Sequence, residues 1–164
     1  MNYFYDTFPT PLGEFSVAVN SHGSIVATAF GDASELRQRF NVDELVRDPI
    51  RVVTARKQIT EYFAGKRSTF DLKLAPAGSP FQHAVWTGLQ AIPFGETRSY
   101  ASLAESVDRP GAARAVGRAN ATNPICLIIP CHRVIGSDGS LTGFAFGEEI
   151  KRKLLDHESA LATA

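Results

Sequence analysis

Hydrophobic and polar positions alternate in two short stretches near the N-terminus. The alternating apolar residues are Phe15, Val17 and Val19, followed by Ile25, Ala27 and Ala29. A period of two is typical of half-buried β-strands. Residues 20–23, Asn-Ser-His-Gly, separate the two stretches and are typical turn formers. The pattern therefore predicts a β-hairpin.

Helical spacing follows the hairpin. Asp32 and Glu35 form a capping-box pattern, which predicts a helix to about Phe40. Asp48-Pro49 indicates a second helix start, because proline is favoured at the first helical position, and Gly65 is typical of a helix end. The apolar residues of this second helix are Val52, Ala55, Ile59, Tyr62 and Phe63. The first half is therefore expected to be a small sheet with two helices.

Residues 74–80, Leu-Ala-Pro-Ala-Gly-Ser-Pro, are the best candidate linker, because they hold two prolines, a glycine and no charge. We place a domain boundary near Ser79. The predicted fold class is α/β, with a small hairpin-based α/β domain over residues 1–78. A mostly helical domain over residues 79–164 follows. A chain of 164 residues is long enough to bury a core in such a fold.

The second half contains three helix patterns before its cysteine motif. Ser79-Pro80 opens a helix with an apolar face, Trp86 packs beside that face, and Pro93 ends the helix. Ser99 caps a short helix through Val107, and residues 112–119 form an alanine-rich helix. Two short helices joined by a glycine-containing turn predict a helix-turn-helix, although any αα-hairpin gives the same pattern.

Composition and charge exclude several classes of protein. Hydrophobic residues make up 44%, charged residues make up 21%, and 17 basic residues balance 17 acidic ones, as in a globular protein without a strong overall basic charge. Residues 109–133 nevertheless hold four arginines and no acid, which is either sampling or an arginine face suited to phosphates. Two cysteines make no disulfide framework, and no apolar run approaches the ~20 residues of a membrane span. No basic residue precedes Arg37, so we expect a cytoplasmic protein without a secretory signal.

Cys131 is the candidate nucleophile. It directly follows the apolar run 125–129 and a proline, at a point where the chain can turn toward a cleft. Its neighbours His132 and Arg133 are the types of group that favour a thiolate. The alternative is a buried, inert cysteine, which suits Cys126 inside the run. The two cysteines and four histidines lack paired ligand spacing, so we expect no metal and no cofactor.

Glu158 is the candidate partner of the base. Ile150, Leu154 and Glu158 recur every four residues, which places the carboxylate on the apolar face of the last helix. An inward carboxylate needs a partner, and a histidine whose tautomer it fixes is a suitable one. The alternative is a frayed, solvated helix end. A thiol, a base and an orienting acid serve hydrolysis, thiol chemistry or group transfer equally well.

One family matches these residues closely. Asn123-Pro124 and residues 128–136, Ile-Ile-Pro-Cys-His-Arg-Val-Ile-Gly, resemble the active-site signature of O6-alkylguanine-DNA alkyltransferases. The resemblance extends over most of residues 79–158 and, loosely, to the turn at residues 10–13. It implies an N-terminal α/β domain, a helix-turn-helix domain and the direct, stoichiometric transfer of an alkyl group from O6-alkylguanine in DNA to a cysteine. O4-alkylthymine is a further candidate substrate.

The resemblance also assigns roles to individual residues. Cys131 would accept the alkyl group, His132 would deprotonate it through a water, and Glu158 would orient His132. Asn123 would brace the active-site loop, and Tyr100 would contact the flipped base and supply a proton. The expected DNA-binding residues are Arg114, which would fill the space left by the base, together with Tyr100, Ala115 and Arg118. The expected substrate pocket is formed by Trp86, Val134, Phe144, Ala145 and Phe146.

The sequence departs from the family pattern at three pocket positions. Phe144 and Ala145 replace a tyrosine and a serine found in other members, and Phe146 stands where members sensitive to benzylguanine have a glycine. The zinc ligands of some animal members have no counterpart here. The expected partner is double-stranded DNA with alkylated bases, bound by a monomer, with cooperative binding along DNA left open. Two competing hypotheses are an alkyltransferase-like damage sensor, which would lack the acceptor cysteine, and an unrelated cysteine hydrolase.

Overall fold

The computed structural model describes residues 2–42 and 44–162. The chain divides into two compact units, Met1–Ala77 and Gly78–Ala164. Each unit has its own hydrophobic core, and each is described by itself below.

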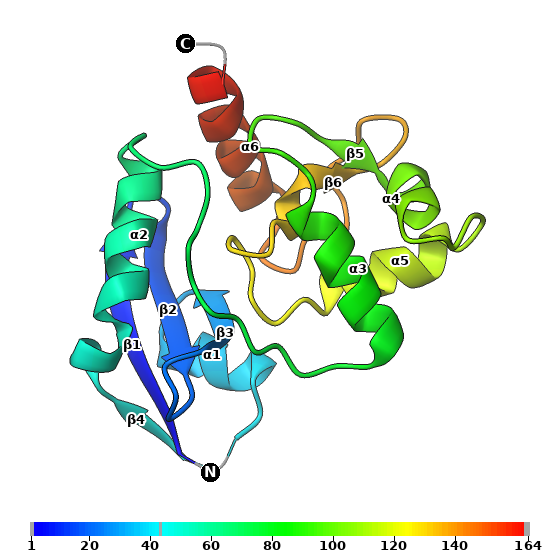
Figure 1. Cartoon of the computed structure of the whole chain (residues 1–164). Coiled ribbons are helices and arrows are strands. Elements are labelled where there is room, and N and C mark those ends of the chain that lie inside the picture. The colour runs from blue at the N-terminus through cyan, green and yellow to red at the C-terminus, as the bar shows by residue number, and fades with distance from the viewer. Residues whose placement is uncertain (1, 43, 163–164) are drawn as a thin grey trace. The chain divides into compact units, whose positions relative to one another are not determined.

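The N-terminal unit is built on a four-stranded sheet in the order β3-β2-β1-β4 (Figure 1). Its strands are β1 (Tyr3–Thr10), β2 (Gly13–Val19), β3 (Ile25–Phe30) and β4 (Leu45–Arg47). The predicted hairpin is confirmed, because β2 and β3 pair antiparallel. Antiparallel β1 and parallel β4 complete the sheet and were not predicted. One inward position of β1 is Asp6, whose carboxylate is paired with Arg47 and Arg56. A carboxylate at a buried position interrupts the alternation of apolar and polar residues by which a strand is predicted.

Two helices accompany this sheet. Helix α1 (Ala33–Arg39) begins where predicted, with the Asp32 side chain accepting hydrogen bonds from the backbone N–H groups of Ser34 and Glu35. The second predicted helix starts as a 3₁₀ turn, η1 (Pro49–Val52), before it becomes α2 (Val53–Phe63). Gly65 ends it with a φ of +76°, a conformation that costs glycine little.

The C-terminal unit is mostly helical, as predicted. Its helices are α3 (Pro80–Gln90), α4 (Tyr100–Ser106), α5 (Ala113–Ala121) and α6 (Glu148–Ala162). Ser79 and Gln82 form a reciprocal capping box at α3, and Ser99 caps α4. The two-residue strands β5 (Arg98–Ser99) and β6 (Val134–Ile135) pair parallel. Among the described residues, no helix combines the length and apolar character that crossing a bilayer requires.

The apolar run at residues 125–129 is a buried segment of turns and not a strand. Leu127 adopts a φ of +73°, which interrupts any extended backbone. Asn123 stabilises the segment from inside, because its Nδ2 donates to the Ile129 carbonyl at 2.8 Å and its Oδ1 accepts from the Ile125 N–H at 3.0 Å. The buried run thus acts as a rigid support for the residues that follow it.

Candidate active site

The residues after this run form a 3₁₀ turn, η2 (Cys131–Arg133), which is held inside the C-terminal unit. Cys131 is 5% exposed and His132 is fully buried. The Cys131 N–H donates to the Ile129 carbonyl at 2.7 Å, so the turn is fixed to the buried segment before it. Cys126 and Cys131 are buried and form no disulfide within the described residues.

Glu158, on α6, lies directly against this turn. Its inward position is confirmed, since it is only 1% exposed. His132 Nε2 lies 2.8 Å from Glu158 Oε2. The Arg133 guanidinium donates from Nε to Oε1 at 2.8 Å and from a terminal nitrogen to Oε2 at 3.1 Å. The carboxylate therefore binds both residues that follow the cysteine.

Arg133 corrects the expectation of an arginine face. It is 7% exposed, and besides its bonds to Glu158 it donates to the Ile92 carbonyl at 2.7 Å. A buried guanidinium needs such partners, so Arg133 is unavailable to a phosphate. Arg109, Arg114 and Arg118 are the exposed members of that arginine group.

The pKa values of the pair explain its charge state. Burial alone raises the pKa of Glu158, but the hydrogen bonds and charges of His132 and Arg133 outweigh burial and hold that pKa well below its usual range. Burial lowers the pKa of His132, more than the neighbouring Glu158 raises it. Near neutral pH the pair is therefore a carboxylate and a neutral imidazole.

This charge state assigns the tautomer of His132. A carboxylate accepts hydrogen bonds only, so the imidazole proton lies on Nε2, facing Glu158. Nδ1 is then the free acceptor of the ring. Among the described residues this buried Nδ1 has no hydrogen-bond partner. An imidazole held in this way can take up a proton from a thiol, directly or through a water.

Lys151 is a further charged residue at the turn, and it was not predicted. Its side chain is fully buried, and its Nζ donates to the Val134 carbonyl at 2.6 Å. Burial lowers its pKa, whereas interaction with Cys131 and Glu148 raises it. Lys151 shares the buried face of α6 with Leu154 and Glu158. Its helical spacing from these two residues was therefore the sequence signal that could have predicted its burial. A lysine at such a position is normally taken as solvated.

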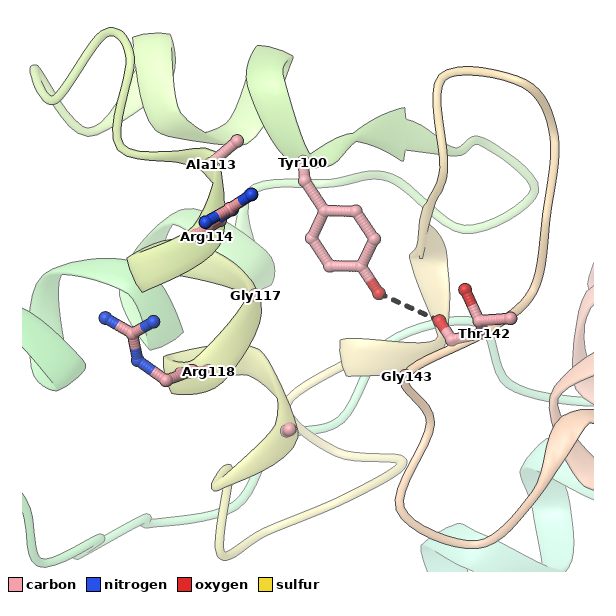
Figure 2. Close-up of a pocket in the computed structure, with 8 residues that line it drawn as sticks. Tyr100, Ala113, Arg114, Gly117, Arg118, Thr142 and Gly143 are labelled. Atoms are coloured by element: carbon pink, nitrogen blue, oxygen red, sulfur yellow. Dashed lines mark hydrogen bonds between the residues drawn. The ribbon is translucent and has the colours of Figure 1, made fainter.

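An open pocket of about 510 Å³ lies beside α5 (Figure 2). The pocket is lined by Tyr100, Ala113, Arg114, Gly117, Arg118, Ala121, Thr142 and Gly143. The Tyr100 hydroxyl donates to the Thr142 carbonyl at 3.1 Å. Gly143 has a φ of +88°, and a Cβ there would lie 3.0 Å from the Tyr100 oxygen. The glycine thus lets the backbone approach the phenol closely. Burial raises the pKa of Tyr100 and Cys131 raises it further, so the phenol keeps its proton.

The structure brings together three of the predicted DNA-binding residues, Tyr100, Arg114 and Arg118, at this pocket. Ala115 lies on the same helix and is partly exposed. The five residues predicted to line a substrate pocket are distributed differently. Trp86, Val134 and Phe144 are buried, Ala145 is exposed, and Phe146 is half-buried. The indole of Trp86 donates to the Ala119 carbonyl at 2.8 Å, which places it in the α3–α5 core.

The usual ligand sets of metal sites combine several His, Cys, Asp or Glu side chains. Within the described residues, no group of three or more His, Cys, Asp or Glu side chains is placed to hold one. The His132 Nε2 is already bonded to the Glu158 carboxylate, which Arg133 also binds.

The C-terminal unit thus holds a buried cysteine and a histidine–carboxylate pair together with an arginine-bearing helix that borders an open pocket. The comparisons with known proteins identify the family. The family described as 6-O-methylguanine DNA methyltransferase matches in both its parts, the ribonuclease-like domain over residues 3–76 and the DNA binding domain over residues 80–160. The chain belongs to this family, as its signature predicted, and thereby to an enzyme class of methyltransferases.

Individual relatives support the same family assignment. A methylated-DNA--protein-cysteine methyltransferase of Methanosarcina barkeri is 45% identical over 156 residues, 94% of this chain and 96% of that protein. A protein of the same name from Mycobacterium tuberculosis is 43% identical over 162 residues, 98% of this chain and 94% of that protein. The solved structure of Mycobacterium tuberculosis OGT in complex with DNA superposes with a TM-score of 0.88 at 39% identity, covering 96% of this chain and 94% of that one.

Proposed function

We propose that this protein repairs DNA by moving the alkyl group of O6-alkylguanine onto the Sγ of Cys131, once per molecule. The single observation that carries the proposal is the buried His132–Glu158 pair, held against the turn that begins with Cys131. The name of the relatives, methylated-DNA--protein-cysteine methyltransferase, describes the same reaction, and the related Mycobacterium tuberculosis protein was solved in complex with DNA.

The side chains of the site account for the bonds and protons that change in the transfer step. The Cys131 thiol gives its proton to Nδ1 of His132, through a water, and Glu158 stabilises the imidazolium that forms. The thiolate attacks the alkyl carbon, an S–C bond forms, and the bond from that carbon to O6 breaks. The electron pair of the broken bond passes to the guanine, which takes up a proton from the Tyr100 hydroxyl. The proton held by His132 then returns to the Tyr100 phenolate through solvent, so both side chains regain their starting protonation states. The products are unmodified guanine and a thioether at Cys131. The thioether is not cleaved again, so each protein molecule reacts once.

The DNA partner is double-stranded DNA with an alkylated base, bound through α5. O6 of a stacked guanine cannot reach a buried thiol, so the nucleotide must leave the helix, at a cost of a few kcal/mol. Arg114 is exposed on α5 and fills the space that the base vacates, while Arg118 contacts the phosphate backbone. The small side chain of Ala115 lets the helix approach the groove. Braced by Asn123, the turn meets the extruded base as a rigid acceptor.

The proposal also covers the setting of the reaction. We expect a cytoplasmic monomer that needs no cofactor. O4-alkylthymine has an equivalent alkyl–oxygen bond on a ring carbon and is the second substrate to test. The presence of Cys131 argues against the damage-sensor hypothesis. The arginines at the pocket argue against the hydrolase hypothesis.

Intact mass after incubation with an O6-methylguanine duplex tests the proposed function. One methyl group should be added per chain, and peptide mapping should place it on Cys131. The Cys131→Ser variant should gain no mass, whereas Cys126→Ser, which alters the other cysteine, should react like the unmodified protein. Binding without any mass gain would establish a damage sensor, and a methyl group on Cys126 would overturn the assignment of Cys131.

A further inference from the structure

Asn120 lies on the buried face of α5, the helix whose other face presents the pocket arginines. The Asn120 side chain is 1% exposed, whereas Arg114 and Arg118 are exposed. Val116 and Ala119 are buried with it, so this face of α5 forms part of the core. A polar amide among these apolar neighbours requires an explanation other than hydrophobic packing.

The Asn120 amide points at the acceptor turn. Its Nδ2 donates to the backbone carbonyl of Cys131 at 3.3 Å. Its Oδ1 is buried and, among the described residues, has no hydrogen-bond partner. The amide also lies close enough to Tyr100 to lower the pKa of the phenol, against the larger effects of burial and of Cys131, which raise it. Asn120 therefore lies among the cysteine, the phenol and the DNA-facing helix.

Helix α6 supplies further side-chain bonds to this turn, and Arg133 also donates to the Ile92 carbonyl. Glu158 binds His132 and Arg133, and Lys151 binds the carbonyl of Val134. In the part of the chain that the structure describes, the Asn120 bond joins α5 to the turn directly, at the residue that carries the thiol. A buried amide oxygen without a partner costs free energy, so stability alone does not account for asparagine at this position.

We propose that Asn120 is a positioning residue, which holds Cys131 in register with α5 so that a base extruded at Arg114 meets the thiol. This inference rests on the proposed function. In a duplex the extruded base is tied to the strand that α5 binds, so its place is set by that helix. A free base enters the site without that constraint and can adapt to a displaced thiol. Loss of the Asn120 bond should therefore impair the duplex reaction selectively.

The test compares Asn120→Leu, which keeps the volume, and Asn120→Ala, which keeps the helix, on two substrates. The rate of methyl transfer from an O6-methylguanine duplex should fall by about 10- to 100-fold, the penalty expected for a displacement of about 1 Å. The rate with free O6-methylguanine should change less than about threefold. Duplex affinity and its salt dependence should stay unchanged, because Asn120 is buried and contacts no phosphate.

Thr122→Val is the matched control. Thr122 lies at the end of the same helix and bonds to the Arg118 and Ala119 carbonyls and to Gln82, away from the turn. It should leave both rates unchanged. Equal losses on the two substrates, or no loss in either Asn120 variant, would overturn the positioning role. An unmodified protein that transfers no methyl group at all would instead refute the proposed function, and the inference with it.

Discussion

Glu158 and His132 lie 26 residues apart in the chain, yet Glu158 Oε2 and His132 Nε2 are 2.8 Å apart in the core. The same carboxylate binds Arg133 with both oxygens. One side chain from α6 thus bonds to the buried His132 ring and also neutralises a buried guanidinium. This double role makes a substitution at Glu158 both a chemical and a structural change.

Glu158→Gln should slow methyl transfer and destabilise the protein together. The amide does not stabilise an imidazolium, so we expect the transfer rate to fall by about 100-fold or more, in the range of lost acid–base catalysis. Arg133 would be left buried without its counter-ion, which typically costs about 3–5 kcal/mol. Single-turnover kinetics and denaturant unfolding measure the two effects.

Glu149→Gln is the control for this substitution. It removes a carboxylate from the same helix, where Glu149 forms an exposed ion pair with Lys153. Transfer by this variant should match that of the unmodified protein, and its stability should change by less than about 1 kcal/mol. If Glu158→Gln behaved in the same way, Glu158 would have no role in the reaction.

Stability should fall in acid in two stages. The pKa of His132 is lowered by burial, so as the pH falls below about 6.5 the unfolded chain binds a proton that the folded protein resists. The pKa of Glu158 is also lowered, so the unfolded state takes up a second proton below about pH 4.3. Both shifts make the free energy of unfolding decrease with falling pH. Urea unfolding between pH 8 and pH 3 measures the profile.

Two variants separate these stages. Glu158→Gln should lack the contribution of the carboxylate below about pH 4.3, and His132→Gln should lack the stage near pH 6.5. A pH profile shared by both variants and the unmodified protein would assign the acid sensitivity to other groups.

Arg114→Ala should impair repair of the duplex more than reaction with the free base. If Arg114 fills the space left by the base, its loss removes compensation for the unstacked nucleotide, and we expect a duplex rate at least about tenfold lower, equivalent to about 1.4 kcal/mol. Arg118→Ala is the comparison, since loss of a phosphate contact should mainly lower affinity and the salt slope by about one unit. Equal losses on duplex and free base would contradict the role of Arg114.

Lys151→Met should separate function from stability. The substitution removes the desolvation cost of a buried charge but leaves the Val134 carbonyl without this donor, so the two effects should offset and the free energy of unfolding should change little. The ammonium attracts a thiolate at Cys131, so its loss should slow alkylation of the thiol by iodoacetamide at neutral pH. Lys153→Met, at a half-exposed side chain on the same helix, is the control. A large loss of stability with unchanged thiol reactivity would make Lys151 a structural residue.

Phe146→Gly should increase inactivation by free O6-benzylguanine. The resemblance described above implies that this ring stands where sensitive members have glycine, and here Phe146 packs edge to face on Phe144 with ring centroids 5.8 Å apart. Because Phe146 is only half-buried, its removal should cost less than the ~3–5 kcal/mol typical of a fully buried ring. Inactivation rates and thermal melting distinguish the outcomes. A large drop in melting temperature without faster inactivation would show that Phe146 packs and does not restrict entry.

Local patterns predicted those parts of the fold that depend on neighbouring residues. The hairpin, the Asp32, Ser79 and Ser99 caps and the inward face of Glu158 all follow from spacing of a few positions. Strand β1 was not predicted because one of its buried positions carries Asp6. The arginines that pair with Asp6 come from β4 and α2, about 40 to 50 residues away. The two-residue strands β5 and β6 leave too short a pattern to detect.

Local sequence is enough to identify the signature around Cys131, the arginine-bearing helix and the carboxylate of the last helix, because each is encoded within one or two turns of chain. The bonds between these parts depend on how the chain folds. In the folded protein Arg133 is buried and bonded to Glu158, and Lys151 is buried beside the turn. The Asn120 amide donates to the Cys131 carbonyl. Spacing along a helix states which face a side chain occupies, but the partner that satisfies a buried polar group is chosen by packing between segments distant in sequence.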